Sequence, residues 1–141
     1  ALQARPLQTP EPEDADYLFR QMADFQFLIV SLGRLRKAAL VAQSVAAVSG
    51  EIRSAVETFD AALPGLARMR NVGEHVEDYA IDSTMRHDKT VDRRMLQVAR
   101  WDENVFMWLG EQLSLAAAQS AARELYLALK DAQQRVGTDE R

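Results

Sequence analysis

The sequence of 141 residues contains no cysteine, and its only histidines are His75 and His87. The lack of cysteine excludes disulfides, thiolate zinc sites, iron–sulfur clusters and a thiol nucleophile. The scarcity of histidine excludes a histidine-rich metal centre. Histidine is also the side chain that ordinarily titrates near neutral pH. Few residues are therefore candidates for acid–base catalysis at that pH.

The sequence also lacks a run of 18 apolar residues, because charged and amide side chains interrupt its most apolar segment, 25–48. We therefore expect no membrane-spanning helix. The first residues do not resemble a signal peptide, so we expect a cytoplasmic protein. The net charge of −4 disfavours a protein that coats nucleic acid non-specifically, but it leaves room for a local basic patch. Of 17 basic residues three are lysine, so 14 are arginine, a bias that suits a GC-rich bacterial genome.

The length and the 48% hydrophobic content are typical of one globular domain. We place this domain at residues 13–136. A flexible arm at 1–12 precedes it and holds three of the four prolines, and a frayed tail at 137–141 follows it.

Apolar residues recur at helical spacing and predict helices at about 13–48, 51–63, 65–82 and 115–135. Gly33 is expected to bend the first helix, Ser49-Gly50 to end it, and Ser114 to cap the last one. Between 95 and 109, alternating apolar residues around Asp102-Glu103-Asn104 predict a β-hairpin, with a helix as the rival interpretation. The predicted fold is mainly α: a four-helix bundle with a small β-hairpin insertion before the last helix.

One motif stands out in the third predicted helix, where residues 70–79 are RNVGEHVEDY. Its Arg70-Asn71-x-x-x-His75 resembles the signature of the HEPN superfamily of small all-helical proteins. The resemblance implies a metal-independent endoribonuclease, often a toxin or defence component, that acts as a homodimer. It also implies RNA as substrate and, in some cases, a nucleotidyltransferase-type antitoxin as partner. In one branch of the superfamily a tyrosine follows the histidine by two residues. Glu77 holds that position here, and Tyr79 comes four residues after the histidine.

Helix geometry gives an independent view of the motif. Asn71, His75 and Tyr79 are spaced by four and should share one face of a helix. Arg70 and His75 would lie about 140° apart around an ideal helix. They could meet if the Arg70 side chain wraps around the helix, if Gly73 loosens the turn, or if a dimer brings together residues of two chains.

The chemistry expected of the motif needs no metal and no cofactor. His75 would exchange protons and Arg70 would hold the phosphate, which makes these two the candidate catalytic residues. Asn71 and Tyr79 would position the substrate. A basic run after the motif could follow an RNA backbone. Its members are Arg86, Lys89, Arg93 and Arg94.

The same residues also allow other interpretations. Arg70 and Glu74 could form an ordinary i,i+4 ion pair, and His75 could be a structural residue in a non-catalytic binding module of bacterial origin. A metal-dependent hydrolase would instead use carboxylates and one imidazole on this helix. Those ligands would be Glu74, His75, Asp78 and Asp82. The aromatic residues Trp101, Phe106 and Trp108 are expected to cover a core or a dimer face.

Overall fold

A computed structural model describes residues 12–139, with side chains described from Arg20 to Thr138. It is mainly helical, with one small three-stranded antiparallel sheet. The predicted arm falls outside the described residues except for Pro12, where the first helix already begins. No helix within residues 12–139 is long and apolar enough to cross a membrane.

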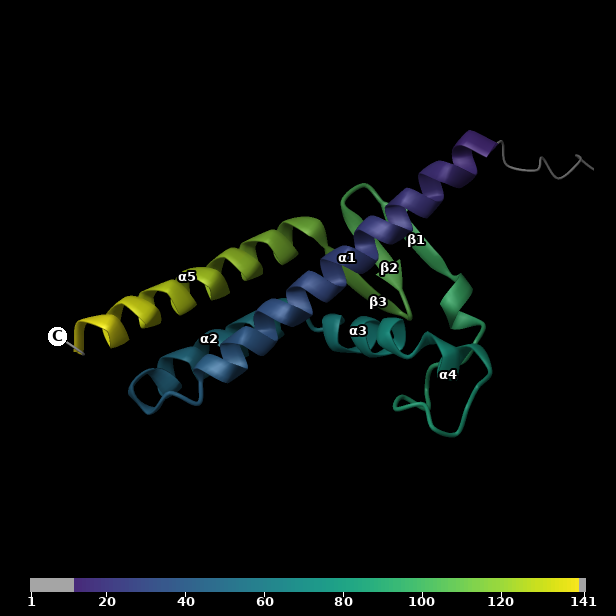
Figure 1. The fold of residues 1–141 in the computed structure, drawn as a ribbon. Helices are drawn as coiled ribbons and strands as arrows, with labels where there is room; N and C mark the ends of the chain where they lie inside the picture. Colours follow the sequence, from purple (N-terminus) through teal and green to yellow (C-terminus); the bar gives the residue numbers. More distant parts are fainter. Residues whose placement is uncertain (1–11, 140–141) are drawn as a thin grey trace, which may run out of the picture.

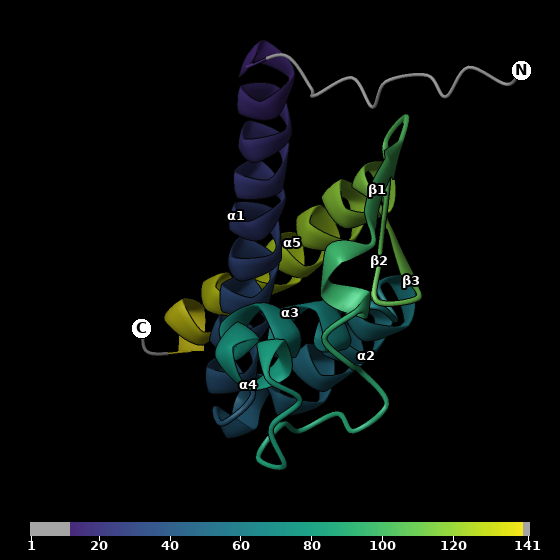
Figure 2. The same cartoon turned by 90° about the vertical axis from the view of Figure 1, so that its right-hand side faces the viewer.

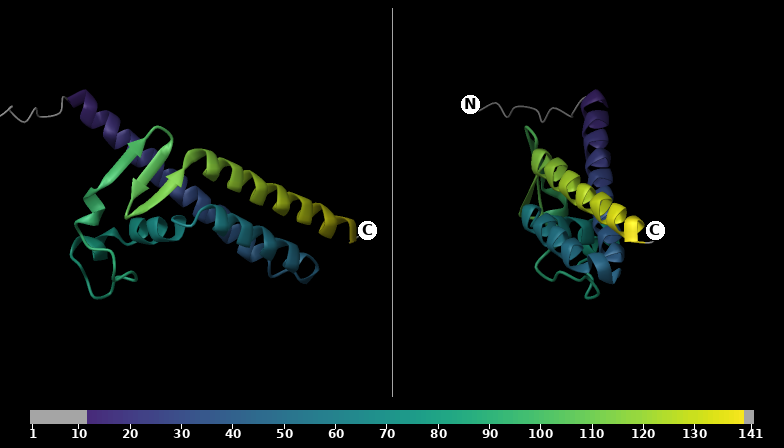
Figure 3. Two further views of the ribbon diagram at one scale, coloured as in Figure 1. Left: turned by 180° about the vertical axis from the view of Figure 1, so that it is seen from behind. Right: turned by 90° about the vertical axis from the view of Figure 1, so that its left-hand side faces the viewer.

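Three long helices form the frame: α1 (Pro12–Ala42), α2 (Ser49–Ala62) and α5 (Leu115–Asp139). Figure 1 shows α5 running beside α2 while α1 crosses them, and Figure 3 shows the same arrangement from behind. The buried residues of α2 recur at spacings of three and four, and α5 meets them with a stripe rich in alanine, which lets the two helices approach closely. These buried residues are Ile52, Val56 and Phe59 of α2 and Ala118, Ala121, Leu125 and Ala132 of α5.

The helix boundaries differ in part from those predicted. The first helix ends at Ala42 and not near Val48, because amides from Ser44 onward bond three residues back and tighten the chain into a turn. A short 3₁₀ segment, Ala46–Val48, follows it. The Ser49-Gly50 pair, predicted as a stop, begins α2. The last helix starts as predicted at Leu115, where the Ala117 amide donates to Ser114 Oγ at 3.3 Å, but it runs to Asp139.

The predicted hairpin is present as β1 (Ala99–Asp102) and β2 (Val105–Trp108), with Trp101 opposite Phe106. Its first residues are not strand but a 3₁₀ turn, Met95–Gln97. A third strand that the sequence analysis missed, β3 (Glu111–Ser114), pairs with β2 and places Leu113 opposite Phe106. Leu109 and Gly110 both have positive φ, and this turn folds β3 back onto β2.

Aromatic side chains attach the sheet to α1, as expected for core residues. Phe25 of α1 stacks on Phe106, and Trp101 meets both rings edge-on, with centroids 5.8 and 5.0 Å away. Trp108 donates its indole N–H to the Leu96 carbonyl at 3.1 Å. The sheet therefore stands beside α1, as Figure 2 shows.

The helix predicted over 65–82 is interrupted. It divides into α3 (Leu66–Glu74) and α4 (Val76–Ala80), because His75 leaves the helical region, with φ −124° and ψ 36°. A loop from residue 81 to the 3₁₀ turn then returns the chain to the sheet. With this break and the third strand, the fold differs in detail from the predicted four-helix bundle with a hairpin insertion.

Candidate functional site

Arg70 lies where α3 packs against α1, and its aliphatic stem crosses Gly33. A Cβ atom added at Gly33 would come within 2.8 Å of Arg70 Cδ, so a larger residue would have to displace the Arg70 side chain from this path. α1 continues through Gly33 without interruption, and the bend predicted there stays a prediction. The structural role of Gly33 is the close approach of the arginine.

A pocket of about 270 Å³ opens beside this contact, at the junction of α1, α2 and α3. Arg36 and Asp60 form part of its wall and bond to each other in a bidentate pair, with N–O distances of 2.7 and 2.8 Å. The hydrogen bonds that Arg36 donates to Asp60 raise the pKa of Arg36 above its ordinary value, against a smaller effect of burial. The pocket is lined by Gly33, Arg36, Asp60, Leu63, Pro64, Leu66, Ala67 and Arg70.

Arg70 differs from the other arginines that the structure half-buries. Arg36 bonds to Asp60, Arg68 to an aspartate and a carbonyl, and Arg86 to three carbonyls. Among the described residues, Arg70 has no hydrogen-bond acceptor and no ion-pair partner, so the expected pair with Glu74 is not formed. Partly buried donors are usually satisfied by protein, water or ligand. This half-buried guanidinium can bond to water or to an anion that enters the pocket.

Asn71 and Tyr79 meet, but across the break between α3 and α4. Tyr79 is fully buried, and its hydroxyl donates to Asn71 Oδ1 at 2.6 Å. The same hydroxyl accepts the Asp88 amide at 2.9 Å, which ties the following loop to α3. That Asn71 and Tyr79 position a substrate stays a prediction. In this structure the two side chains are already bonded to each other.

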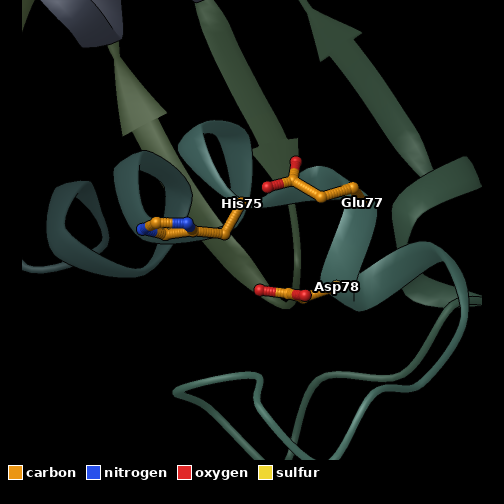
Figure 4. Close-up of side chains that lie close together, drawn as sticks. All are labelled: His75, Glu77 and Asp78. Atoms are coloured by element: carbon orange, nitrogen blue, oxygen red, sulfur yellow. The ribbon is translucent and has the colours of Figure 1, made fainter.

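His75 does not share their face, contrary to the helix geometry predicted. The helix stops there, and the imidazole is exposed. The carbonyl of His75 accepts the amides of Asp78 and Tyr79, which begins α4 in a new direction. Figure 4 shows the imidazole extending back along α3, with the carboxylates of Glu77 and Asp78 near it. The pocket that Arg70 lines does not include His75.

The possible metal ligands are not those expected. His75, Glu77 and Asp78 place one donor atom each within 4.8 Å of one another, whereas Glu74 and Asp82 are not part of this group. Asp82 instead accepts the Arg93 amide at 2.9 Å. One imidazole and two carboxylates on four successive residues could hold a divalent cation only with water completing its coordination.

The basic run after the motif is mostly bound within its own loop. Arg86 donates to the carbonyls of Asp82, Ser83 and Val91. The Lys89 ammonium donates to the Thr84 carbonyl, and Arg93 lies 3.9 Å from an Asp82 carboxylate oxygen. Arg94 is exposed and has no side-chain partner in the described part of the chain. Contact of these residues with RNA stays a prediction.

Three residues of the region were missed in the sequence, namely Arg36, Asp60 and Arg68. Arg36 and Asp60 are 24 positions apart, and the acceptors of Arg68 lie 20 to 43 positions away. No local pattern marks such pairs, because they form only when α2, the loop and the sheet have packed. Gly33, seen as a weak point of a helix, was the one local signal of a close contact.

Comparison of the chain with family models, with curated proteins and with solved structures gave no match.

Proposed function

We propose that the chain is a metal-independent endoribonuclease of the HEPN type that acts as a homodimer, with Arg70 and His75 as catalytic residues. One observation carries the proposal: Arg70 is held half-buried over Gly33, lines a pocket and has no acceptor among the described residues. The helix break adds to it, since an imidazole at an exposed junction can reach a substrate.

The reaction would use the RNA's own 2′-hydroxyl. An imidazole takes the proton from the 2′-oxygen, which attacks the neighbouring phosphorus. The bond from phosphorus to the 5′-oxygen breaks, and an imidazolium returns a proton to that oxygen. The products are a 2′,3′-cyclic phosphate and a 5′-hydroxyl, and Arg70 stabilises the charge on the phosphoryl oxygens.

A dimer would bring the two residues to one substrate. Because the Arg70 pocket does not include His75 within one chain, an RNA strand across a two-fold axis would meet Arg70 of one protomer and His75 of its partner. A nucleotidyltransferase-type antitoxin that blocks this site, in a bacterial cytoplasm, belongs to the same proposal.

A specific observation favours a second candidate, a non-catalytic binding module. Glu77 and Asp78 place negative charge beside His75, which repels phosphate. In a binding module these residues would face a basic or neutral partner, and His75 would perform no proton transfer.

Purified protein incubated with RNA in EDTA distinguishes the two candidates. The ribonuclease proposal expects cyclic phosphate ends, with cleavage abolished in His75→Ala and retained in His87→Ala. His87 is a suitable control because it too is exposed and has no side-chain bond in the described residues. Circular dichroism shows whether each variant folds. Cleavage that persists in folded His75→Ala, or folded wild-type protein that cuts no RNA, would favour the binding module.

A further inference from the structure

The two edges of the small sheet differ in what covers them. The strand order is β1–β2–β3, so β1 and β3 are the edge strands. The residue before α3 lies against β3, because a Cβ atom added at Gly65 would come within 2.8 Å of Glu111 Cβ and 3.4 Å of the Gln112 carbonyl oxygen. β1 is on the other side of the sheet, away from α5 (Figure 3), and β2 is its one strand partner among the described residues. An uncovered edge strand can pair with another chain.

The register of the hairpin shows which backbone groups of β1 point to this open edge. Asp102 and Val105 flank the two-residue turn and are paired with each other. In such a hairpin the pair next to the turn exchanges both backbone hydrogen bonds, and bonded pairs then alternate with unbonded ones. Trp101 follows in an unbonded pair, so its N–H and C=O point outward, as do those of Ala99.

The face of β1 that points away from α1 carries two opposite charges. Side chains alternate along a strand, and Trp101 points toward α1, where its ring meets Phe25. Arg100 and Asp102 therefore lie on the other face. Both are exposed, and neither has an ion-pair partner in the part of the chain that the structure describes. The Arg100 guanidinium contacts the sulfur of Met107 at 3.7 Å.

Two copies of β1 placed antiparallel, edge to edge, have one favourable register. When Trp101 pairs with the partner's Trp101, Arg100 lies opposite the partner's Asp102 and Asp102 opposite the partner's Arg100. A slip of two residues is the smallest that keeps the outward groups facing each other, and it opposes two arginines or two aspartates. Opposite charges in facing positions stabilise a strand pair, and like charges destabilise it. The charge pattern of β1 is therefore complementary to itself about Trp101.

We propose that two copies of this chain associate through the open edges of their β1 strands, around a two-fold axis at Trp101, and form one continuous antiparallel sheet. A hollow of about 250 Å³ between β1 and α1 is lined in part by Met22 and Trp101, and it leaves room beside this edge for the partner's indole ring. Such a contact uses the same surface on both copies and closes after two. The inference goes beyond the proposed function, which names no contact surface, and it uses neither Arg70 nor His75.

Sedimentation velocity over a range of protein concentrations, without RNA, tests the proposal. The wild type should form dimers as its concentration rises. Arg100→Asp opposes aspartates at both facing positions, and Asp102→Arg opposes arginines there. Each change should therefore raise the dissociation constant by about tenfold. Arg123→Asp on α5 changes the net charge as Arg100→Asp does, but at an exposed position away from the sheet, and it should leave the dissociation constant unchanged.

Mixing the two weakened variants gives the sharpest form of this test. A copy with Arg100→Asp and a copy with Asp102→Arg oppose an aspartate to an arginine at both facing positions. The mixture should therefore associate about as tightly as the wild type, although each variant alone does not. Circular dichroism shows that each variant is folded. A monomeric wild type, or a mixture of folded variants that associates no better than each alone, overturns the proposal.

Amide hydrogen exchange locates the contact. The amides of Ala99 and Trp101 should exchange more slowly as the protein concentration rises, because the partner strand then accepts their hydrogen bonds. The amide of Arg100 should change less, since it belongs to a pair that is already bonded within the hairpin. Protection that rises with concentration on the helices and not at Ala99 and Trp101 would show that another surface forms the dimer.

These results are separable from catalysis. If dimers form through β1 but the protein cuts no RNA in EDTA, the proposed function fails and the contact surface stands. If the protein cuts RNA as a dimer that Arg100→Asp does not weaken, the ribonuclease stands and pairing through β1 is overturned.

Discussion

The two sides of α3 use the same residue type in opposite ways. On the side facing the loop and sheet, Arg68 lies 3.0 Å from Asp88 and donates to the Leu109 carbonyl at 3.1 Å and to Thr90 Oγ1 at 3.3 Å. On the side facing α1, Arg70 crosses Gly33 and has no acceptor among the described residues. Two arginines two positions apart thus differ in what remains for a ligand: the charge of Arg68 holds the fold, and that of Arg70 is available.

The difference extends to the acidic residues. Asp88 pairs with Arg68, and Asp60 pairs with Arg36. Asp88 also accepts hydrogen bonds from the amide and the hydroxyl of Thr90, so it organises a loop. Asp60 only closes the pocket wall. In the basic run of the loop, three of the four side chains have partners within the loop, through hydrogen bonds or an ion pair. In this respect they are like Arg68 and unlike Arg70. A positive residue in a sequence is therefore a weak indication of a binding surface until its acceptors are known.

The largest effect on stability is expected for Arg68→Met. This change removes the contacts to Asp88, Thr90 and Leu109 and should lower the free energy of unfolding by about 2 kcal/mol, as for lost hydrogen bonds to a charged group. Arg70→Met should lower it by less than about 0.5 kcal/mol, because it breaks no bond and keeps the stem. Urea denaturation of both variants measures the difference. Equal losses would remove the contrast between the two sides of α3.

Tyr79→Phe should cost about 1 kcal/mol, because the Asn71 oxygen and the Asp88 amide lose their partner while the ring stays packed. Relative to the wild type, amide hydrogen exchange in Tyr79→Phe should quicken more in residues 82–90 than in α2 and α5. Exchange that quickens equally throughout the molecule would show that this bond does not hold the loop specifically.

Features that a local pattern determines could be predicted from the sequence. The periodicity of α1, α2 and α5 and the hydroxyl of Ser114 act within a few residues, and the structure confirms these helices and that cap. Features that depend on contacts between distant residues could not be predicted. The polar strand β3 exists because it can pair with β2, and the break at His75 carries no proline to mark it. The motif was visible, but the pocket beside it depends on residues 24 positions apart.

Acid should first weaken the contacts of Asp88, which hold the loop against α3. The bond from the Thr90 hydroxyl lowers the pKa of Asp88 below its ordinary value of 3.8, with smaller contributions from the Thr90 amide and Arg68 opposing the effect of burial. A carboxyl whose pKa is lower in the folded than in the unfolded state stabilises above its unfolded pKa, and that stability is lost as pH falls below about 4. Asp88→Asn should reduce this acid-dependent loss, as thermal unfolding between pH 5 and 3 can show. An identical pH dependence in the variant would contradict the assignment.

Asp60→Asn should have a smaller effect on stability than Arg68→Met or Tyr79→Phe. The pair with Arg36 is partly exposed, so its loss should cost less than about 1 kcal/mol. Phosphate affinity should rise roughly threefold to fivefold, since a unit charge a few ångströms away contributes on the order of 1 kcal/mol at a wet surface. Titration calorimetry gives the sign, and a fall in affinity would place the anion elsewhere.

The most direct test is a phosphate titration followed by amide chemical shifts in nuclear magnetic resonance. The shifting amides should cluster at Gly33, Ala67 and Arg70, around the pocket, and Arg70→Met should remove the shifts. Shifts centred instead on residues 86–94, unchanged in Arg70→Met, would show that the loop and not the pocket carries the available charge.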